Sequence, residues 1–220
     1  MWGTSVALII VFFAVFDRRD YLKLAASLIG VSALLFTAKG NALGHVLMLV
    51  FSALYAAISY RVAYYGEMIT YLGMTAPMCL LSLISWLRHP YAGKKSIVKI
   101  NRIRPAEWGI AAVLTVAVTI AFFFILRAMG NASLWPSTIS VTTSFFAAYL
   151  TLRRSPYYAL AYAANDAVLL VLWIIAAVHT PSYWAVVACF VAFLAGDSYG
   201  FFNWLRMQKS QNQPDTSDAQ

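Results

Sequence analysis

The chain has 220 residues, of which 62% are hydrophobic and only 11% are charged, and its mean hydropathy is +0.72. These fractions lie well outside those of a soluble domain, so the composition predicts an integral membrane protein in a lipid bilayer. A formal net charge of +8 is compatible with nucleic-acid binding, but the basic residues cluster between hydrophobic runs instead of forming a stripe with aromatic residues. We therefore expect no nucleic-acid partner.

Hydrophobic runs predict about eight helices. The first, 2–16, is short for a span of about 20 residues and lacks the flanks of a signal peptide, so we interpret it as an extra N-terminal helix within segment 1–20. The other helices are expected at 21–38, 41–64, 65–87, 105–127, 135–152, 157–178 and 183–207. Pro77 should kink its helix, whereas Pro105 suits a helix start.

Basic residues indicate the orientation in the membrane. The connector 88–104 carries six Lys and Arg residues and no acid, which places it in the cytoplasm by the positive-inside rule. Counting alternate loops puts the pair Arg153 and Arg154 inside as well. Arg18 and Arg19 disagree with this topology, but they lie in a loop with two acids. The polar segment 208–220 is predicted to be a disordered cytoplasmic tail.

An internal repeat is indicated by two similar motifs about 118 residues apart. Ser85-Trp86-Leu87-Arg88 ends one helix and Asn203-Trp204-Leu205-Arg206 ends another. Each motif closes three helices, in segments 21–88 and 131–207, and the connector with its linker helix occupies 89–130. An odd linker helix keeps both triplets in one orientation. We therefore predict an all-α membrane bundle with a parallel three-plus-one-plus-three repeat and a substrate site between its halves.

The strongest candidate site lies on the helix 157–178. Five side chains share one face of this helix, because spacings of three, four and seven residues follow its turn: Tyr158, Tyr162, Asn165, Asp166 and Trp173. Placing a carboxylate near the bilayer centre costs about 2.5–3.5 kcal/mol on insertion scales, so Asp166 needs a partner or a water-filled cavity. A structural bond across helices is the alternative role for Asn165 and Asp166.

Three further helices present polar faces that we expect to line the same cavity. The candidates among them are Ser52, Tyr55, Ser144, Asp197, Tyr199 and Asn203. Aromatic side chains with a few amides and hydroxyls suit a flat heterocycle attached to a sugar or alcohol. Ser and Thr in membrane helices also bond to neighbouring backbone, and His45 and the two motif tryptophans have an interfacial role as an alternative.

Other functional classes find less support. The three histidines are dispersed, and Asp166 with Asp197 is the only candidate acid pair within the spans, so we predict no enzyme. Cys79 and Cys189 lie in apolar runs without metal-ligand spacing, so we expect neither metal nor cofactor. An ion-coupled transporter or channel would carry more intramembrane charge, and it stays the less favoured alternative.

Several motifs resemble the PnuC-type nicotinamide riboside transporters. In the first triplet they are Gly40-Asn41-Ala42-x-Gly44, Ser52-x-x-Tyr55-x-x-x-Ser59-Tyr60, Tyr65-Gly66-Glu67, Pro77-Met78 and Trp86, and in the second Arg153-Arg154, Asn165 and the run ending at Trp204. The resemblance spans 21–207. It implies a SWEET-like fold, a homotrimer in the bacterial plasma membrane, and facilitated diffusion of a vitamin-like molecule that a cytosolic kinase then traps by phosphorylation.

The chain departs from the family pattern around the expected cage for the substrate. Where the resemblance implies an acid and two tryptophans, the chain has Pro156, Tyr158 and Ala161, and Ala148 replaces an expected glutamine. Tyr158, with Tyr162 and Asp166, is expected to rebuild the cage. The small-molecule substrates left open are nicotinamide riboside, thiamine, riboflavin and deoxynucleosides.

Overall fold

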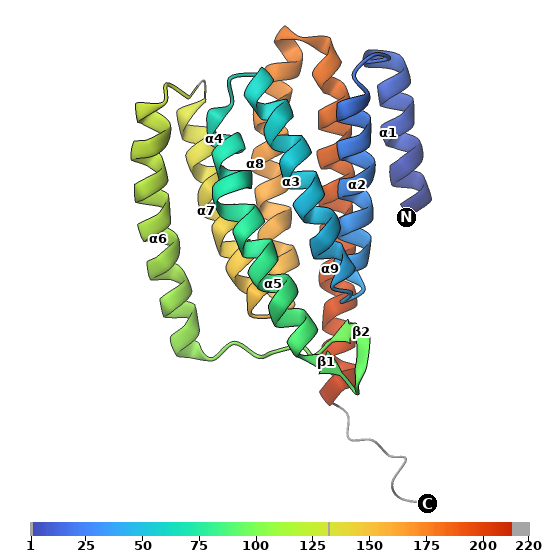
Figure 1. Ribbon diagram of the computed structural model, residues 1–220, viewed down its shortest axis with the longest axis vertical. Helices are drawn as coiled ribbons and strands as arrows, with labels where there is room; N and C mark the ends of the chain where they lie inside the picture. Colours follow the sequence, from blue (N-terminus) through green and yellow to red (C-terminus); the bar gives the residue numbers. More distant parts are fainter. Residues whose placement is uncertain (1, 132, 213–220) are drawn as a thin grey trace, which may run out of the picture.

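The computed structural model describes residues 2–131 and 133–212, which form a bundle of long helices (Figure 1). The eight helices expected from the sequence are all present. They are α1 (Trp2–Phe16), α2 (Tyr21–Ala38), α3 (Leu43–Arg61), a composite of α4 (Tyr65–Ile69), η1 (Thr70–Thr75) and α5 (Ala76–Arg88), α6 (Pro105–Ala128), α7 (Leu134–Leu152), α8 (Tyr157–His179), and η2 (Pro181–Tyr183) continuing as α9 (Trp184–Asn212).

Six of the described helices are long and apolar enough to cross a bilayer: α2, α3, the composite Tyr65–Arg88, α6, α8 and Pro181–Asn212. The seventh long helix, α7, has 19 residues and packs between α6 and α8. α1 has only 15 residues, which rise about 22 Å, less than the roughly 30 Å of a bilayer core. It packs against α2 and α9 at one edge of the bundle, opposite α6 (Figure 1).

The composite helix changes its winding just before Pro77. Proline has no N–H to donate to the preceding turn, so a regular α-helix would lose a bond there. Residues Thr70–Thr75 instead form a π-helix, in which the Ala76 N–H bonds to the carbonyl of Tyr71, five residues back. The α-helical winding resumes at Ala76 and continues to Arg88. The effect of Pro77 is therefore spread over the turns that precede it.

The polar connector and the end of the chain form a small unit. A hairpin of β1 (Pro90–Tyr91) and β2 (Lys94–Val98) lies beside the end of α9 (Figure 1). Gln211 fixes this contact, because its Nε2 donates to the Val98 carbonyl at 3.0 Å and its Oε1 accepts from the Ile100 N–H at 2.8 Å. The predicted disorder is therefore wrong for 208–212, which are helical; 213–220 lie outside the described residues.

The two motif tryptophans make equivalent contacts at one end of the bundle, here called the inner end, where the chain turns at 39–42 and 153–156. The Trp86 indole N–H donates to the Thr151 carbonyl at the end of α7, at 3.0 Å. The Trp204 indole N–H donates to the Thr37 carbonyl at the end of α2, also at 3.0 Å. The end of α5 is thus bonded to α7, and the end region of α9 is bonded to α2 in the same way.

The residues before these tryptophans make a second matching pair of bonds. Ser85 Oγ donates to the Leu152 carbonyl at 3.2 Å, and Asn203 Nδ2 donates to the Ala38 carbonyl at 2.8 Å. These carbonyls follow those bonded by the tryptophans, and at a helix end they have no intrahelical partner. The inner end is therefore closed by side chains that bond to the last carbonyls of α2 and α7.

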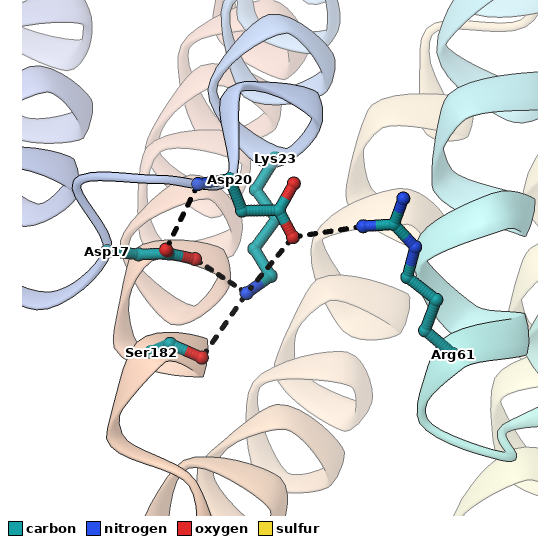
Figure 2. A network of polar contacts seen from close by, with 5 residues as sticks. All are labelled: Asp17, Asp20, Lys23, Arg61 and Ser182. Atoms are coloured by element: carbon teal, nitrogen blue, oxygen red, sulfur yellow. Dashed lines mark hydrogen bonds and ion pairs between the residues drawn. The ribbon is translucent and has the colours of Figure 1, made fainter.

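The opposite, outer end carries a network of ion pairs (Figure 2). The ammonium group of Lys23 lies 2.6 Å from Asp17 Oδ2, 3.5 Å from Asp20 Oδ2 and 3.3 Å from Ser182 Oγ. Arg61 bonds to Asp20 at 3.2 Å. Hence the loop acids pair with Lys23 and Arg61. The network fastens the end of α1 to α2, α3 and η2.

Candidate functional site

A central cavity lies among the long helices of the bundle. Every cavity-lining residue comes from α2, α3, η1, α5, α7, α8 or α9, and among the described residues neither α1 nor α6 contributes one. The lining residues are Leu34, Thr37, His45, Met48, Phe51, Tyr71, Thr75, Met78, Cys79, Ser82, Ser144, Ala148, Thr151, Tyr158, Tyr162, Asn165, Asp166, Phe193 and Asp197. The cavity measures about 40 Å³, room for about three water molecules. A nucleoside would require it to widen.

Six of the eleven candidate site residues line this cavity: Tyr158, Tyr162, Asn165, Asp166, Ser144 and Asp197. The first four occupy the N-terminal half of α8, where successive turns of the helix place them on one face. Ser144 faces them from α7, and Asp197 from α9. The structure therefore brings together the polar groups that were expected on three different helices.

Trp173 and two residues of α3 lie elsewhere. The Trp173 indole donates to the hydroxyl of Tyr55 at 2.6 Å, and both side chains are buried in the apolar core on the outer side of the cavity. Trp173 shares the face of Asp166, but seven residues of helix displace it about 10 Å along the axis. Ser52 donates to the Met48 carbonyl of its own helix at 2.8 Å. None of these three residues is among those that line the cavity.

The remaining two candidates, on α9, are also outside the cavity. Asn203 is bonded to the Ala38 carbonyl at the inner end. Tyr199 is 39% exposed and borders a surface hollow between α1, α2 and α9. It follows Asp197 by two residues, which is about 200° around a helix, so the two side chains point away from each other. The expectation that Asn203 and Tyr199 line the cavity is not met.

Asn165 is held by three hydroxyl groups of α7. Its Oδ1 accepts hydrogen bonds from Thr143 at 2.9 Å, from Ser144 at 3.0 Å and from Ser140 at 3.4 Å. These hydroxyls recur at helical spacing, so a single face of α7 forms the cradle. With the oxygen engaged, the NH₂ group of Asn165 is the part of the amide that can donate to a bound molecule.

Asp166 and Asp197 form a pair within the cavity. They are only 3% and 4% exposed, and their carboxyl groups lie within hydrogen-bonding reach of each other. Asp166 Oδ2 is buried without a partner among the described residues, and so is Nε2 of His45, another lining residue. An unpaired buried polar atom costs about 1–3 kcal/mol, so these atoms mark positions where a bound molecule would gain hydrogen bonds.

Glu67 is a buried acid that lies outside the polar helix faces predicted from the sequence. It is fully buried on α4 and accepts from Ser140 Oγ at 3.4 Å, so Ser140 lies between Glu67 and Asn165. Its Oε1 has no partner among the described residues. An acid within an apolar span is itself a signal of function, and this signal was available from the sequence.

The electrostatic character of the cavity is acidic. Its lining contains two carboxyl groups and, among the described residues, neither Lys nor Arg. Tyrosines, a histidine and several hydroxyls supply hydrogen-bonding groups, and Phe51 with Phe193 supplies apolar surface. An arrangement of this kind can hold a flat molecule with hydroxyl groups, uncharged or positively charged, and disfavours an anion.

Apolar helices of spanning length around a buried central cavity with several polar lining groups define a multi-pass membrane protein with the architecture of a membrane transporter. Comparison with known proteins agrees. The chain belongs to the nicotinamide mononucleotide transporter family, whose sequence pattern it matches over residues 20–206. The match begins just before α2, so α1 lies outside it. The protein is thus a multi-pass transporter of the bacterial membrane.

Individual relatives are named after nicotinamide riboside and not after the mononucleotide of the family description. The nicotinamide riboside transporter PnuC of Neisseria mucosa is 25% identical over 210 residues, covering 89% of this chain and 76% of the relative. The protein of the same name from Haemophilus influenzae is 22% identical over 196 residues, covering 88% and 83%. The crystal structure of the vitamin B3 transporter PnuC superposes with a TM-score of 0.81 at 21% identity, covering 96% of this chain and 91% of that one. The last comparison shows the fold.

Proposed function

We propose that this protein carries a nicotinamide riboside-like nucleoside or vitamin across the membrane by facilitated diffusion, and that a cytosolic kinase then traps the product by phosphorylation. The observation that carries the proposal is the buried cavity between the two helix triplets, with Asn165, Asp166 and Asp197 in its lining. Two relatives named as nicotinamide riboside transporters support the choice of substrate.

The charge of the cavity distinguishes a nucleoside from a nucleotide. A phosphate monoester carries a charge of about −1.5 to −2 near pH 7. The cavity would place it beside Asp166 and Asp197, with neither Lys nor Arg among the described lining residues to balance it. Burying such an anion unpaired is strongly unfavourable. The riboside therefore fits this cavity better than the mononucleotide after which the family is described.

The negative charge of the same two acids also favours some of the candidate substrates over others. Nicotinamide riboside and thiamine each contain a ring with a fixed positive charge, whereas riboflavin and the deoxynucleosides are uncharged. A cation beside Asp166 and Asp197 gains Coulomb attraction that a neutral ring does not. Nicotinamide riboside is our first candidate and thiamine the second. Deoxynucleosides, riboflavin and an ion-coupled cycle are less favoured.

Transport would require the two helix triplets to rock around the cavity as parallel, SWEET-like repeats. Matching bonds in the two halves support this relationship. The turns after α2 and α7 each contain a residue with positive φ, Gly40 at 71° and Arg154 at 56°. Their N–H groups bond to the carbonyls of Thr37 and Thr151, both at 2.9 Å. These same two carbonyls accept the motif tryptophans. The homotrimer implied by the family resemblance is also part of the proposal.

The decisive experiment is a thermal-shift screen of the purified protein against nicotinamide riboside, nicotinamide mononucleotide, thiamine, riboflavin and deoxynucleosides. A ligand stabilises the folded state by about 2.7 kcal/mol at a hundredfold excess over its dissociation constant. We expect the largest shift with nicotinamide riboside and none with the mononucleotide. Proteoliposomes without an ion gradient should then equilibrate the ligand. A shift with the mononucleotide alone, or uptake only with an ion gradient, would contradict the proposal.

A further inference from the structure

Asp166 and Asp197 are buried together in a cavity where no described lining residue is a Lys or Arg. Asp166 comes from α8 and Asp197 from α9, and both line the cavity. The titratable groups that face them from the neighbouring elements are Tyr71 of η1, Tyr158 and Tyr162 of α8, Cys79 of α5, Cys189 of α9 and, across the cavity, His45 of α3. From α2 and α7 only uncharged residues, such as Thr37 and Ser144, reach the cavity.

Two carboxyl groups in this position cannot both be ionised at low cost. Like charges in contact repel strongly away from water, and a pair of acids then keeps one proton between the two groups. The carboxyl groups of Asp166 and Asp197 are close enough to each other for one proton to be shared between them. The pair then carries one negative charge inside the cavity.

We propose that Asp166 and Asp197 form a charge-selective subsite that holds one shared proton when the cavity contains no cation and releases it when a positively charged ring binds. The inference rests on the proposed function, because it takes this cavity as the substrate site. The step balances in charge: a singly negative pair with its proton takes up a monovalent cation and becomes a doubly negative pair bound to that cation, and one proton leaves for the solvent. No bond of the ligand is made or broken.

This linkage predicts a pH dependence with a definite sign. Because cation binding releases a proton, affinity for the cation rises as the pH rises, by up to about tenfold per pH unit while the pair is protonated. An uncharged ring displaces no proton, so its affinity stays constant over the same range. The subsite would thus separate cationic from neutral rings of equal shape, which hydrophobic packing against Phe51 and Phe193 cannot do.

The test measures protons released on binding. Calorimetric titration of the full-length protein at pH 6, in two buffers with different protonation enthalpies, gives the number of protons exchanged per ligand. The probes are nicotinamide riboside and its dihydro form, which has nearly the same shape but no charge. We expect close to one proton released for the cation and none for the neutral form. The same titrations at pH 7 should show up to tenfold tighter binding of the cation alone.

Variants locate the effect. Asp166→Asn and Asp197→Asn each keep a hydrogen-bonding group but remove the shared proton, so we expect proton release to vanish and the preference for the cation to fall at least tenfold. Glu107→Gln is the matched control, since Glu107 is paired with Arg153 at the inner surface, 2.7 Å away. Its proton count should equal that of the wild type.

Each outcome bears on the proposal. Binding of the cation without proton release by the wild type, or with unchanged release in both variants, would overturn the subsite while leaving the proposed function intact. If neither form of the riboside binds the wild type, the proposed function fails, and the inference with it. The wild-type proton count is decisive even where an Asn variant does not fold.

Discussion

The inner end of the bundle and the central cavity use similar residues in different ways. Asn203 at the inner end donates its amide to the Ala38 carbonyl, and Trp204 beside it donates its indole to Thr37. In the cavity, Asn165 is held through its oxygen, which leaves its amide hydrogens available, and Asp166 has an oxygen without a partner. At the inner end the polar atoms complete the backbone hydrogen bonds of the protein. In the cavity they are positioned but left partly unsatisfied, which is what a binding site requires.

The outer end resembles the inner end in this respect, although its partners are charged. Lys23 is almost fully buried, with a side chain 7% exposed, and its ammonium group has two carboxylates, a hydroxyl and the ring of Tyr183 around it. Polar contacts thus close both ends of the bundle, and the cavity with the unpaired atoms of Asp166 and His45 lies between them. Variants can separate the contribution of closed ends from that of the cavity.

The largest effect on stability is expected at Lys23. Lys23→Ala leaves the carboxylate of Asp17, itself only 9% exposed, without its cation, and breaking a buried pair typically costs about 3–5 kcal/mol. The matched control is Arg61→Ala, because Arg61 pairs with Asp20 but has a side chain 58% exposed, and such pairs are worth at most about 1 kcal/mol. Thermal unfolding in detergent measures both. Equal losses of stability would show that burial does not decide the strength of this network.

In the cavity, Asn165→Ala is expected to lower uptake of the riboside at least tenfold, a loss of about 1.4 kcal/mol of binding, because the ligand loses the amide donor. Two of the hydroxyls that hold Asn165 keep another acceptor, since Thr143 bonds to the Ile139 carbonyl at 3.0 Å and Ser140 to Glu67 at 3.4 Å, so membrane expression should not fall. Asn203→Ala is the control at the inner end and should leave ligand affinity unchanged. Wild-type affinity in purified Asn165→Ala protein would remove Asn165 from the site.

The smallest effects are expected for the motif tryptophans. Trp86→Phe and Trp204→Phe keep an aromatic ring but leave the carbonyls of Thr151 and Thr37 without the indole donor, at a cost of about 1 kcal/mol each. For a chain of this length that corresponds to a fall of about 2–4 °C in Tm. Affinity for the riboside should stay within a factor of two. A loss of affinity larger than the loss of stability would instead connect the inner end to the binding site.

The sequence alone determined that the protein lies in a lipid bilayer and where its helices fall. It also determined most of the polar face of α8. Apolar runs of spanning length leave no choice but helices, because every backbone group in a bilayer needs an internal partner. The spacing of Tyr158, Tyr162, Asn165 and Asp166 then places them on one face, because a helix repeats every 3.6 residues. These inferences depend on local geometry, which the sequence encodes directly.

Only the tertiary structure decided how far along each helix the cavity extends and what closes its ends. Trp173 has the angular position of the site but lies beyond the cavity, where it bonds to Tyr55, and Tyr199 lies on the far side of α9 from Asp197. Glu67 reaches the cradle of Asn165 through Ser140 of a different helix. Periodicity gives the direction of a side chain around its own helix, but depth along the axis and partners on other helices depend on how the helices pack, and that information exists only in three dimensions.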